Sequence, residues 1–259
     1  MNKSILGAIA VTLLIVACQT VQQTGRSQFI IVSDEQELRL GQDAYKETLQ
    51  KSRVSTRSDW QARLRRVGQR IAAAAERPEF QWEFNVIQGK EVNAFALPGG
   101  KVAFWEGIMP VAQDDNGIAV IMGHEVAHAL ARHGAERMSQ SMGAEVFGQI
   151  ISLGVGQVSA VGAKNFSPLQ SIPALGATVG LLLPWGRTQE SEADRDRIGL
   201  TLMAKAGYDP AHAIAFWQRM AKIAGDKPPL FLSTHPSDET RISQIREWLP
   251  EARAFYRGK

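Results

Sequence analysis

The stretch HEVAH at residues 124–128 places two histidines and a glutamate at a spacing that suits metal chemistry. Residues four apart lie on one face of a helix, so His124 and His128 can present two imidazole nitrogens to one ion. Glu125 lies about 100° further round the helix, so it flanks the ion rather than binding it. This is the arrangement of a zinc peptidase, in which such a carboxylate takes a proton from the metal-bound water. The alternative is a pair of core histidines with local hydrogen bonds only.

A third ligand has to come from another part of the chain. His133 falls on the opposite face of a continuous helix, so we expect it in a surface or second-layer position. The stretch TQESEADRDRIG offers carboxylates instead. Glu190 and Asp194 are four apart, so one can bind the ion while the other accepts the free N–H of a ligand histidine. Spacing does not choose between Glu190 and Glu192 as the ligand, and an ordinary solvated acidic helix is the alternative.

The composition is that of an ordinary globular protein of 259 residues, with 44% hydrophobic and 21% charged residues. It excludes collagen-like, coiled-coil and disordered chains. The formal net charge is +3. No basic platform with interleaved aromatic residues is present, so we expect no nucleic-acid partner. The arginines within residues 63–70 are interpreted as a solvated helix face.

The N-terminal residues predict an exported, lipid-anchored protein. An apolar run at residues 5–16 has the length of a signal peptide, and the chain's one cysteine, Cys18, follows it. This resembles a bacterial lipoprotein signal, with an ordinary secretory signal as the alternative. Gln19 favours, by bacterial sorting rules, the outer membrane of a Gram-negative bacterium, with a lipid on Cys18 as the membrane contact and the domain in the periplasm. We therefore divide the chain into three parts: a signal peptide (1–17), a lipidated tether (18–32) and a single domain (33–259).

The elements before the motif predict two helices and a small sheet. Helices are expected from Ser33 and from Ser58, because each serine is followed three residues later by a glutamine, as in a capping box. Alternating apolar and polar residues over 82–86 predict a strand. Pro98 and the two glycines after it predict the turn of a hairpin over 91–107.

The helix that carries HEVAH is predicted to be central, because its apolar residues fall on nearly every face. Further helices are expected over 187–207, closed by Gly207, and over 209–225 and 237–249. Residues 143–186 are Gly-rich and apolar but interrupted by polar residues and prolines. We interpret them as a helical hairpin over the cleft or as a surface that touches the membrane. This order of elements indicates an α+β fold.

These motifs together resemble those of the HtpX and CAAX-prenyl-protease type of zinc metallopeptidase, which are gluzincins. The resemblance covers residues 33–248 and rests on NAFALPGG, HEVAH, ESEAD and STHP. It implies a zincin-like, mostly helical α+β fold with a small mixed sheet bordering the active-site cleft, and one Zn²⁺ per chain. The roles that it implies are metal ligation by His124, His128 and Glu190, general base catalysis by Glu125, and an outer-shell carboxylate at Asp194.

Two further sites follow from the resemblance. Asn93, Ala94 and Phe95 would border the cleft and pair with substrate backbone as an added strand, whereas the alternative is an ordinary hairpin strand. His235 would donate a hydrogen bond to the oxyanion or take the metal's fourth position in a resting state, with Arg241 assisting. The alternative for His235 is a loop that only caps the last helix.

We therefore predict a zinc metalloendopeptidase that hydrolyses unfolded or misassembled cell-envelope proteins. One alternative is a non-catalytic quality-control or assembly factor with a structural metal site, and another is a metal carrier. Glu125 discriminates against the first, because a scaffold has no need of a general base. A buried helix and a carboxylate as third ligand argue against the second.

Overall fold

The computed structural model describes residues 18–22, 24–142, 189–223, 231–232 and 239–258. The described strands are β1 (Cys18–Thr20), β2 (Ser27–Phe29), β3 (Glu83–Ile87), β4 (Ala94–Leu97) and β5 (Lys101–Trp105). The described helices are α2 (Asp34–Lys51), α3 (Ser58–Ala75), α4 (Met109–Ala112), α5 (Asp115–Leu130), α8 (Gln189–Lys205), α9 (His212–Ile223) and α11 (Glu239–Arg253). A 3₁₀ turn spans Glu106–Ile108, and residues 133–142 are helical.

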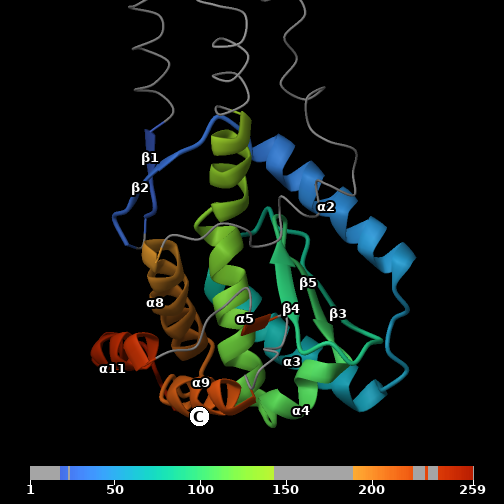
Figure 1. The fold of residues 1–259 in the computed structure, drawn as a ribbon, viewed down its shortest axis with the longest axis vertical. Coiled ribbons are helices and arrows are strands. Elements are labelled where there is room, and N and C mark those ends of the chain that lie inside the picture. The colour runs from blue at the N-terminus through green and yellow to red at the C-terminus, as the bar shows by residue number, and fades with distance from the viewer. Residues whose placement is uncertain (1–17, 23, 143–188, 224–230, 233–238, 259) are drawn as a thin grey trace, which may run out of the picture.

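A three-stranded mixed sheet lies between α2 and α5 (Figure 1). The strand order is β3–β5–β4, with β3 parallel and β4 antiparallel to β5. Side chains alternate between the two faces of a strand. Val86 and Phe104 therefore join the core that α3 and α5 share, whereas Phe95 and Leu97 pack with Tyr45 of α2 on the other face. The predicted mostly helical α+β fold with a small mixed sheet is confirmed.

The predicted hairpin is formed by β4 and β5, with its turn at residues 98–100. Gly99 and Gly100 have φ angles of 84° and 80°. Left-handed backbone of this kind is easily reached by glycine, which has no Cβ. The turn leaves β4 at the edge of the sheet and beside α5.

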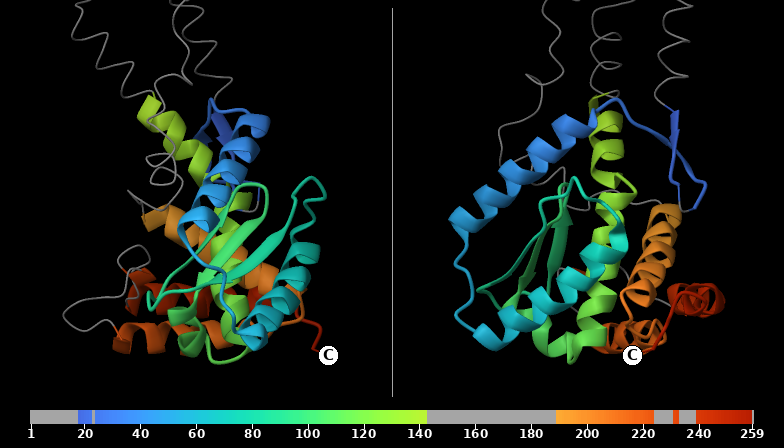
Figure 2. Two further views of the ribbon diagram at one scale, coloured as in Figure 1. Left: turned by 90° about the vertical axis from the view of Figure 1, so that its right-hand side faces the viewer. Right: turned by 180° about the vertical axis from the view of Figure 1, so that it is seen from behind.

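Helix α5 is the centre of the fold, as predicted, and it is buried on nearly all sides. It packs against α8 most extensively, and also against β4, α3 and α9 (Figure 2). Asp114 caps its first turn, since the side chain accepts a hydrogen bond from the Gly117 N–H at 2.8 Å. Because α5 has apolar neighbours all round, polar side chains on it are removed from bulk water.

The two predicted capping boxes have different outcomes. Ser33 and Gln36 form the reciprocal box that starts α2. Ser58 is instead the first residue inside α3, where Arg57 is the cap and no side chain caps the helix, so that prediction is wrong. Gln61 bonds to strand β3, donating to the Phe84 carbonyl and accepting from the Val86 N–H. The backbone groups of β3 thus bind the side-chain amide of Gln61, which is then not available to complete a capping box with Ser58.

The residues predicted to be an unpatterned tether contain an antiparallel hairpin of β1 and β2. Val21 and Ile30 are buried against the body of the protein. The division at residues 1–17, 18–32 and 33–259 and the lipid on Cys18 stay predictions. Residues 143–186, predicted to cover the cleft or touch the membrane, lie outside the described part of the chain. None of the helices in the described part has both the length and the apolar character needed to cross a membrane.

Candidate metal centre

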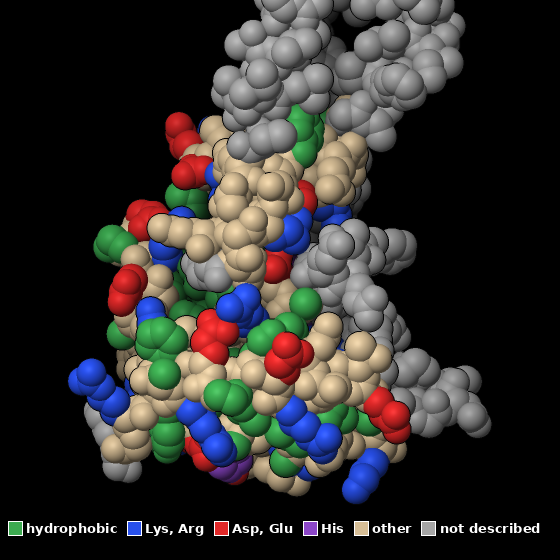
Figure 3. Space-filling model, turned by 90° about the vertical axis from the view of Figure 1, so that its left-hand side faces the viewer, with side chains coloured by type: hydrophobic (Ala, Val, Ile, Leu, Met, Phe, Trp, Pro, Cys, Tyr) green, Lys and Arg blue, Asp and Glu red, His purple; other side chains and the backbone are tan. Residues whose placement is uncertain are grey.

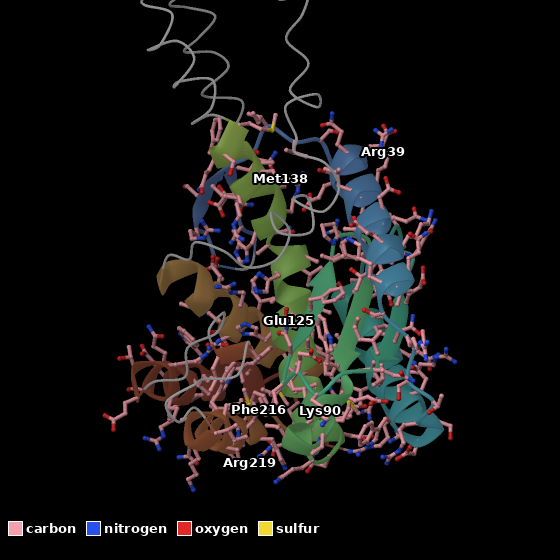
Figure 4. All side chains as sticks on the ribbon, turned by 45° about the vertical axis from the view of Figure 1, so that its right-hand side comes forward. Arg39, Lys90, Glu125, Met138, Phe216 and Arg219 are labelled. Carbon is pink, nitrogen blue, oxygen red and sulfur yellow. The ribbon has the colours of Figure 1, made fainter. Side chains whose placement is uncertain are left out.

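The middle of α5 brings together the three residues of the HEVAH motif. His124, Glu125 and His128 each offer one ligand atom, and these atoms lie within 4.8 Å of one another. His124 and Glu125 are each 2% exposed, and Figure 4 shows Glu125 in the interior, halfway along α5. Two imidazoles beside a carboxylate are the donor types of a catalytic zinc site, so these residues fit the ion.

A buried carboxylate on α8 orients the first histidine. The Nδ1 of His124 lies 2.8 Å from Oδ1 of Asp196. Because Nδ1 donates its proton to this carboxylate, Nε2 is the nitrogen left to bind an ion. Burial by itself would raise the pKa of Asp196, but the charge of Arg241 and the hydrogen bond from His124 outweigh it and lower the pKa. Asp196 is therefore ionised and holds the imidazole in one tautomer.

The structure corrects the outer-shell role predicted for Asp194. Its carboxylate accepts a hydrogen bond from Nε of Arg26 at 2.5 Å, whereas Asp196 is the carboxylate that His124 contacts. Burial raises the pKa of Asp194, but its contacts with His133, Thr24 and Arg26 lower it to about 2. The reason for the error is geometric, because positions 194 and 196 are about 200° apart on a helix. The sequence contains two pairs of acidic residues four positions apart, 190 with 194 and 192 with 196. The resemblance implied the first pair, which lies on the face of α8 away from α5.

A contact between two glycines fixes which face of α8 meets α5. A Cβ on Gly199 would lie 2.9 Å from the carbonyl carbon of Gly123 and 2.9 Å from the backbone nitrogen of His124. The helix backbones therefore touch at this point. Because Gly199 follows Asp196 by three residues, both lie on the same face of α8.

Helix geometry then separates the two candidates for the third ligand. Position 192 lies one turn before Asp196 and shares its face, whereas position 190 is about 200° away from position 192. The backbone of both positions belongs to α8. The side chains of Glu190 and Glu192 lie outside what the structure describes. The face of α8 that meets His124 thus favours Glu192 over the Glu190 that the resemblance implied.

Arg241 contacts Asp196, the carboxylate that orients His124. The prediction that Arg241 contacts substrate or the oxyanion is therefore corrected. Its Nε donates to Oδ2 of Asp196 at 2.7 Å, and an Nη2 donates to Oδ1 at 2.9 Å. The guanidinium also stacks 3.6 Å from the ring centroid of Trp217, which packs edge-on against His124. Arg241 is 5% exposed. Helix α11 therefore supports the metal site through Asp196, and this role had no signal in the sequence.

His133 lies closer to the site than a continuous helix would allow. Helix α5 ends at Leu130, and Arg132 has a φ of 55°, so the chain turns before the next helical residues begin. This turn brings the His133 ring perpendicular to His128, with centroids 5.5 Å apart. Burial lowers the pKa of His133. Arg195, which the sequence analysis missed, places Nη1 2.7 Å from Nε2 and 3.2 Å from Nδ1 of His128.

The strand predicted to bind substrate borders the metal helix. Asn93, Ala94 and Phe95 are buried, at the start of the edge strand β4. Ala94 belongs to the core on the α5 side, whereas the Phe95 ring packs on Tyr45 of α2. Only the backbone and small side chains of β4 are thus directed to the metal side. His235, predicted to assist catalysis, lies outside the described residues.

Comparisons with known proteins agree with this site. The model of peptidase family M48 matches residues 58–249. A mitochondrial metalloendopeptidase OMA1 of Schizosaccharomyces pombe is 39% identical over 88% of this chain and 66% of its own length. That of Saccharomyces cerevisiae is 32% identical over 89% of this chain and 69% of its own length. A putative beta-barrel assembly-enhancing protease of Vibrio cholerae is 33% identical over 70% of this chain and 37% of its own length. The chain thus spans about two thirds of the yeast relatives and about a third of the bacterial one.

These relatives contradict the predicted localisation. The two yeast proteins are mitochondrial by name, so an outer-membrane lipoprotein facing the periplasm is not supported. The short apolar segment before Cys18 was a signal too general to identify a compartment. The predicted resemblance to zinc metallopeptidases is confirmed at the level of the family, as are the enzyme class and the zinc cofactor. The matched residues include the whole of α5 and α8, and this chain belongs to peptidase family M48.

Proposed function

We propose that this chain is a zinc-dependent endopeptidase whose ion is held by His124, His128 and Glu192. The observation that carries the proposal is the histidine pair on α5, of which His124 is buried and oriented by the ionised Asp196. When bound, zinc polarises a carbonyl group and lowers the pKa of a coordinated water to about 7. The curated relatives named as metalloendopeptidases support the assignment of this chemistry.

Glu125 is the general base in this proposal. It lies beside both histidines on α5, 2% exposed, where it can accept a proton from the attacking water and pass it to the leaving amine. A scaffold or a carrier would need only the ligands. The glutamate therefore separates an enzyme from either of those alternatives.

Extended polypeptide segments are the proposed substrates. Strand β4 is the outer strand of the sheet among the described residues and runs beside α5, so its outer edge can pair with substrate backbone. Backbone pairing places little demand on side chains, which suits unfolded or misassembled proteins. We include misassembled envelope proteins among them, and the Vibrio relative, named a putative beta-barrel assembly-enhancing protease, supports this choice.

The test is hydrolysis of a fluorescein-labelled unfolded protein by the zinc-loaded chain and by Glu125→Gln. We expect this variant to keep its zinc and its melting temperature and to lose about 10²–10⁴-fold in rate, the usual contribution of a positioned base. Glu247→Gln, an exposed glutamate on α11, is the matched control and should be fully active. Unchanged cleavage by Glu125→Gln would remove Glu125 as the base, and a zinc-loaded chain that cleaves nothing would favour the scaffold.

A further inference from the structure

Arg26 joins three segments that are far apart in the sequence. It lies in the turn between β1 and β2, and its two terminal nitrogens donate to the two carboxylate oxygens of Glu136 at 2.9 and 2.8 Å. Its Nε donates to Asp194 at 2.5 Å. Glu136 belongs to the helical residues 133–142 and Asp194 to the start of α8. Forked arginine–carboxylate pairs of this kind are directional as well as strong.

The β1–β2 hairpin is also held by buried Val21 and by a hydrogen bond from Arg132 to Gln19. A hollow of about 570 Å³ lies between the hairpin and helices α3, α8 and α11, on the face shown in Figure 3. Val21, Arg77, Ile198, Lys205 and Phe255 are among its lining residues. Beside the apolar contact of Val21 with the core that includes Ile198 and Leu202, the ion pair of Arg26 with Asp194 joins the hairpin to α8.

Asp194, the partner of Arg26, is connected through His133 to the proposed metal ligand His128. Oδ2 of Asp194 is 3.9 Å from Nε2 of His133, and the His133 ring lies against the ring of His128. Asp194 also lies two residues from position 192 and two from Asp196 on α8. If the first turns of α8 moved, the residues that contact His128 and those that contact His124 would therefore both be displaced.

We propose that Arg26 is a positioning residue of the metal centre. It fixes the start of α8 and the helix of residues 133–142 relative to α5, so that His133 stays against His128 and Asp196 stays against His124. The inference rests on the proposed function, because it needs the zinc site. The competing view is that Arg26 only attaches the N-terminal hairpin, which affects stability and leaves the site unchanged.

The test compares zinc affinity, by competition with a chromogenic chelator, in the unmutated chain, Arg26→Met and Arg26→Lys. Arg66→Met is the matched control, because Arg66 forms a similar pair with Asp115 on α3 and α5, remote from the site. Loss of a residue that contacts a metal ligand directly lowers metal affinity about 10–100-fold. Because Arg26 acts on the ligands only indirectly, through Asp194 and Glu136, we expect a smaller loss of zinc affinity, about three- to tenfold, for Arg26→Met. Arg26→Lys keeps the charge but loses the fork, and should lie between.

The visible spectrum of the Co²⁺-substituted protein provides a second readout, because it reports ligand geometry without any assay of cleavage. We expect a changed Co²⁺ spectrum in Arg26→Met and an unchanged one in Arg66→Met. Equal zinc affinity and an unchanged spectrum in Arg26→Met, with a lowered melting temperature, would overturn the proposal. If Arg26→Met does not fold, Arg26→Lys decides by the same criteria. Failure of the proposed function is distinct, since then the unmutated chain would bind no zinc.

Discussion

Asp196→Asn tests whether Asp196, rather than Asp194, is the carboxylate on α8 that orients His124. In the structure this carboxylate accepts hydrogen bonds from His124 and from two nitrogens of Arg241, at 2.7–2.9 Å. An asparagine keeps one acceptor and turns an NH₂ group toward these donors. Removing one partner of a buried ion pair costs about 3–5 kcal/mol of folding free energy. Loss of an outer-shell partner lowers zinc affinity by about 10–100-fold, which corresponds to about 1.4–2.8 kcal/mol.

The assay for this variant is zinc competition at a temperature where the variant is folded, together with urea unfolding. Asp194→Asn is the matched control, because it makes the same chemical change two residues away. It should lose only a few-fold in zinc affinity, through Arg26 and His133, because Asp194 does not contact His124. A larger loss of zinc affinity in Asp194→Asn than in Asp196→Asn would refute the reasoning from helix faces.

Two further predictions concern the elements that hold the site. Gly199→Ala should lower stability by about 1–3 kcal/mol and weaken zinc binding, because its Cβ would meet the backbone of Gly123 and push α8 from α5; equal urea midpoints and zinc affinities would contradict this. Tyr45 donates to the Val102 carbonyl, and burial raises the pKa of its hydroxyl to about 12. Its raised pKa favours the native state below pH 10, so about 2–3 kcal/mol of stability should be lost as pH rises from 10 to 12. Urea unfolding across this range should show a smaller loss in Tyr45→Phe, and an identical loss would remove this tyrosine as the cause.

The local part of the site could be predicted from the sequence, because helix spacing alone determines it. The i, i+4 rule placed His124 and His128 together, and the all-round apolar pattern made α5 central. Alternation and turn residues likewise predicted β3 and the β4–β5 hairpin. In each case the signal and the structure involve neighbouring residues.

The long-range part could not be predicted, because it depends on how helices meet. The choice between Asp194 and Asp196 is made by the Gly123–Gly199 contact, and no spacing rule specifies which face of α8 packs on α5. The position of Arg241 behind Asp196 depends in the same way on the packing of α11. Ser58 failed as a cap for a similar reason, since a strand takes the amide of Gln61.

Zinc content tests the central claim most directly. The measurement is elemental analysis of the purified chain beside Glu192→Gln and Glu190→Gln, each supplied with zinc and then dialysed without chelator. We predict one zinc per chain in the unmutated protein and in Glu190→Gln, and loss of most of it in Glu192→Gln. Zinc retained by Glu192→Gln and lost by Glu190→Gln would contradict the ligand set, and an unmutated chain without zinc would contradict the metallopeptidase itself.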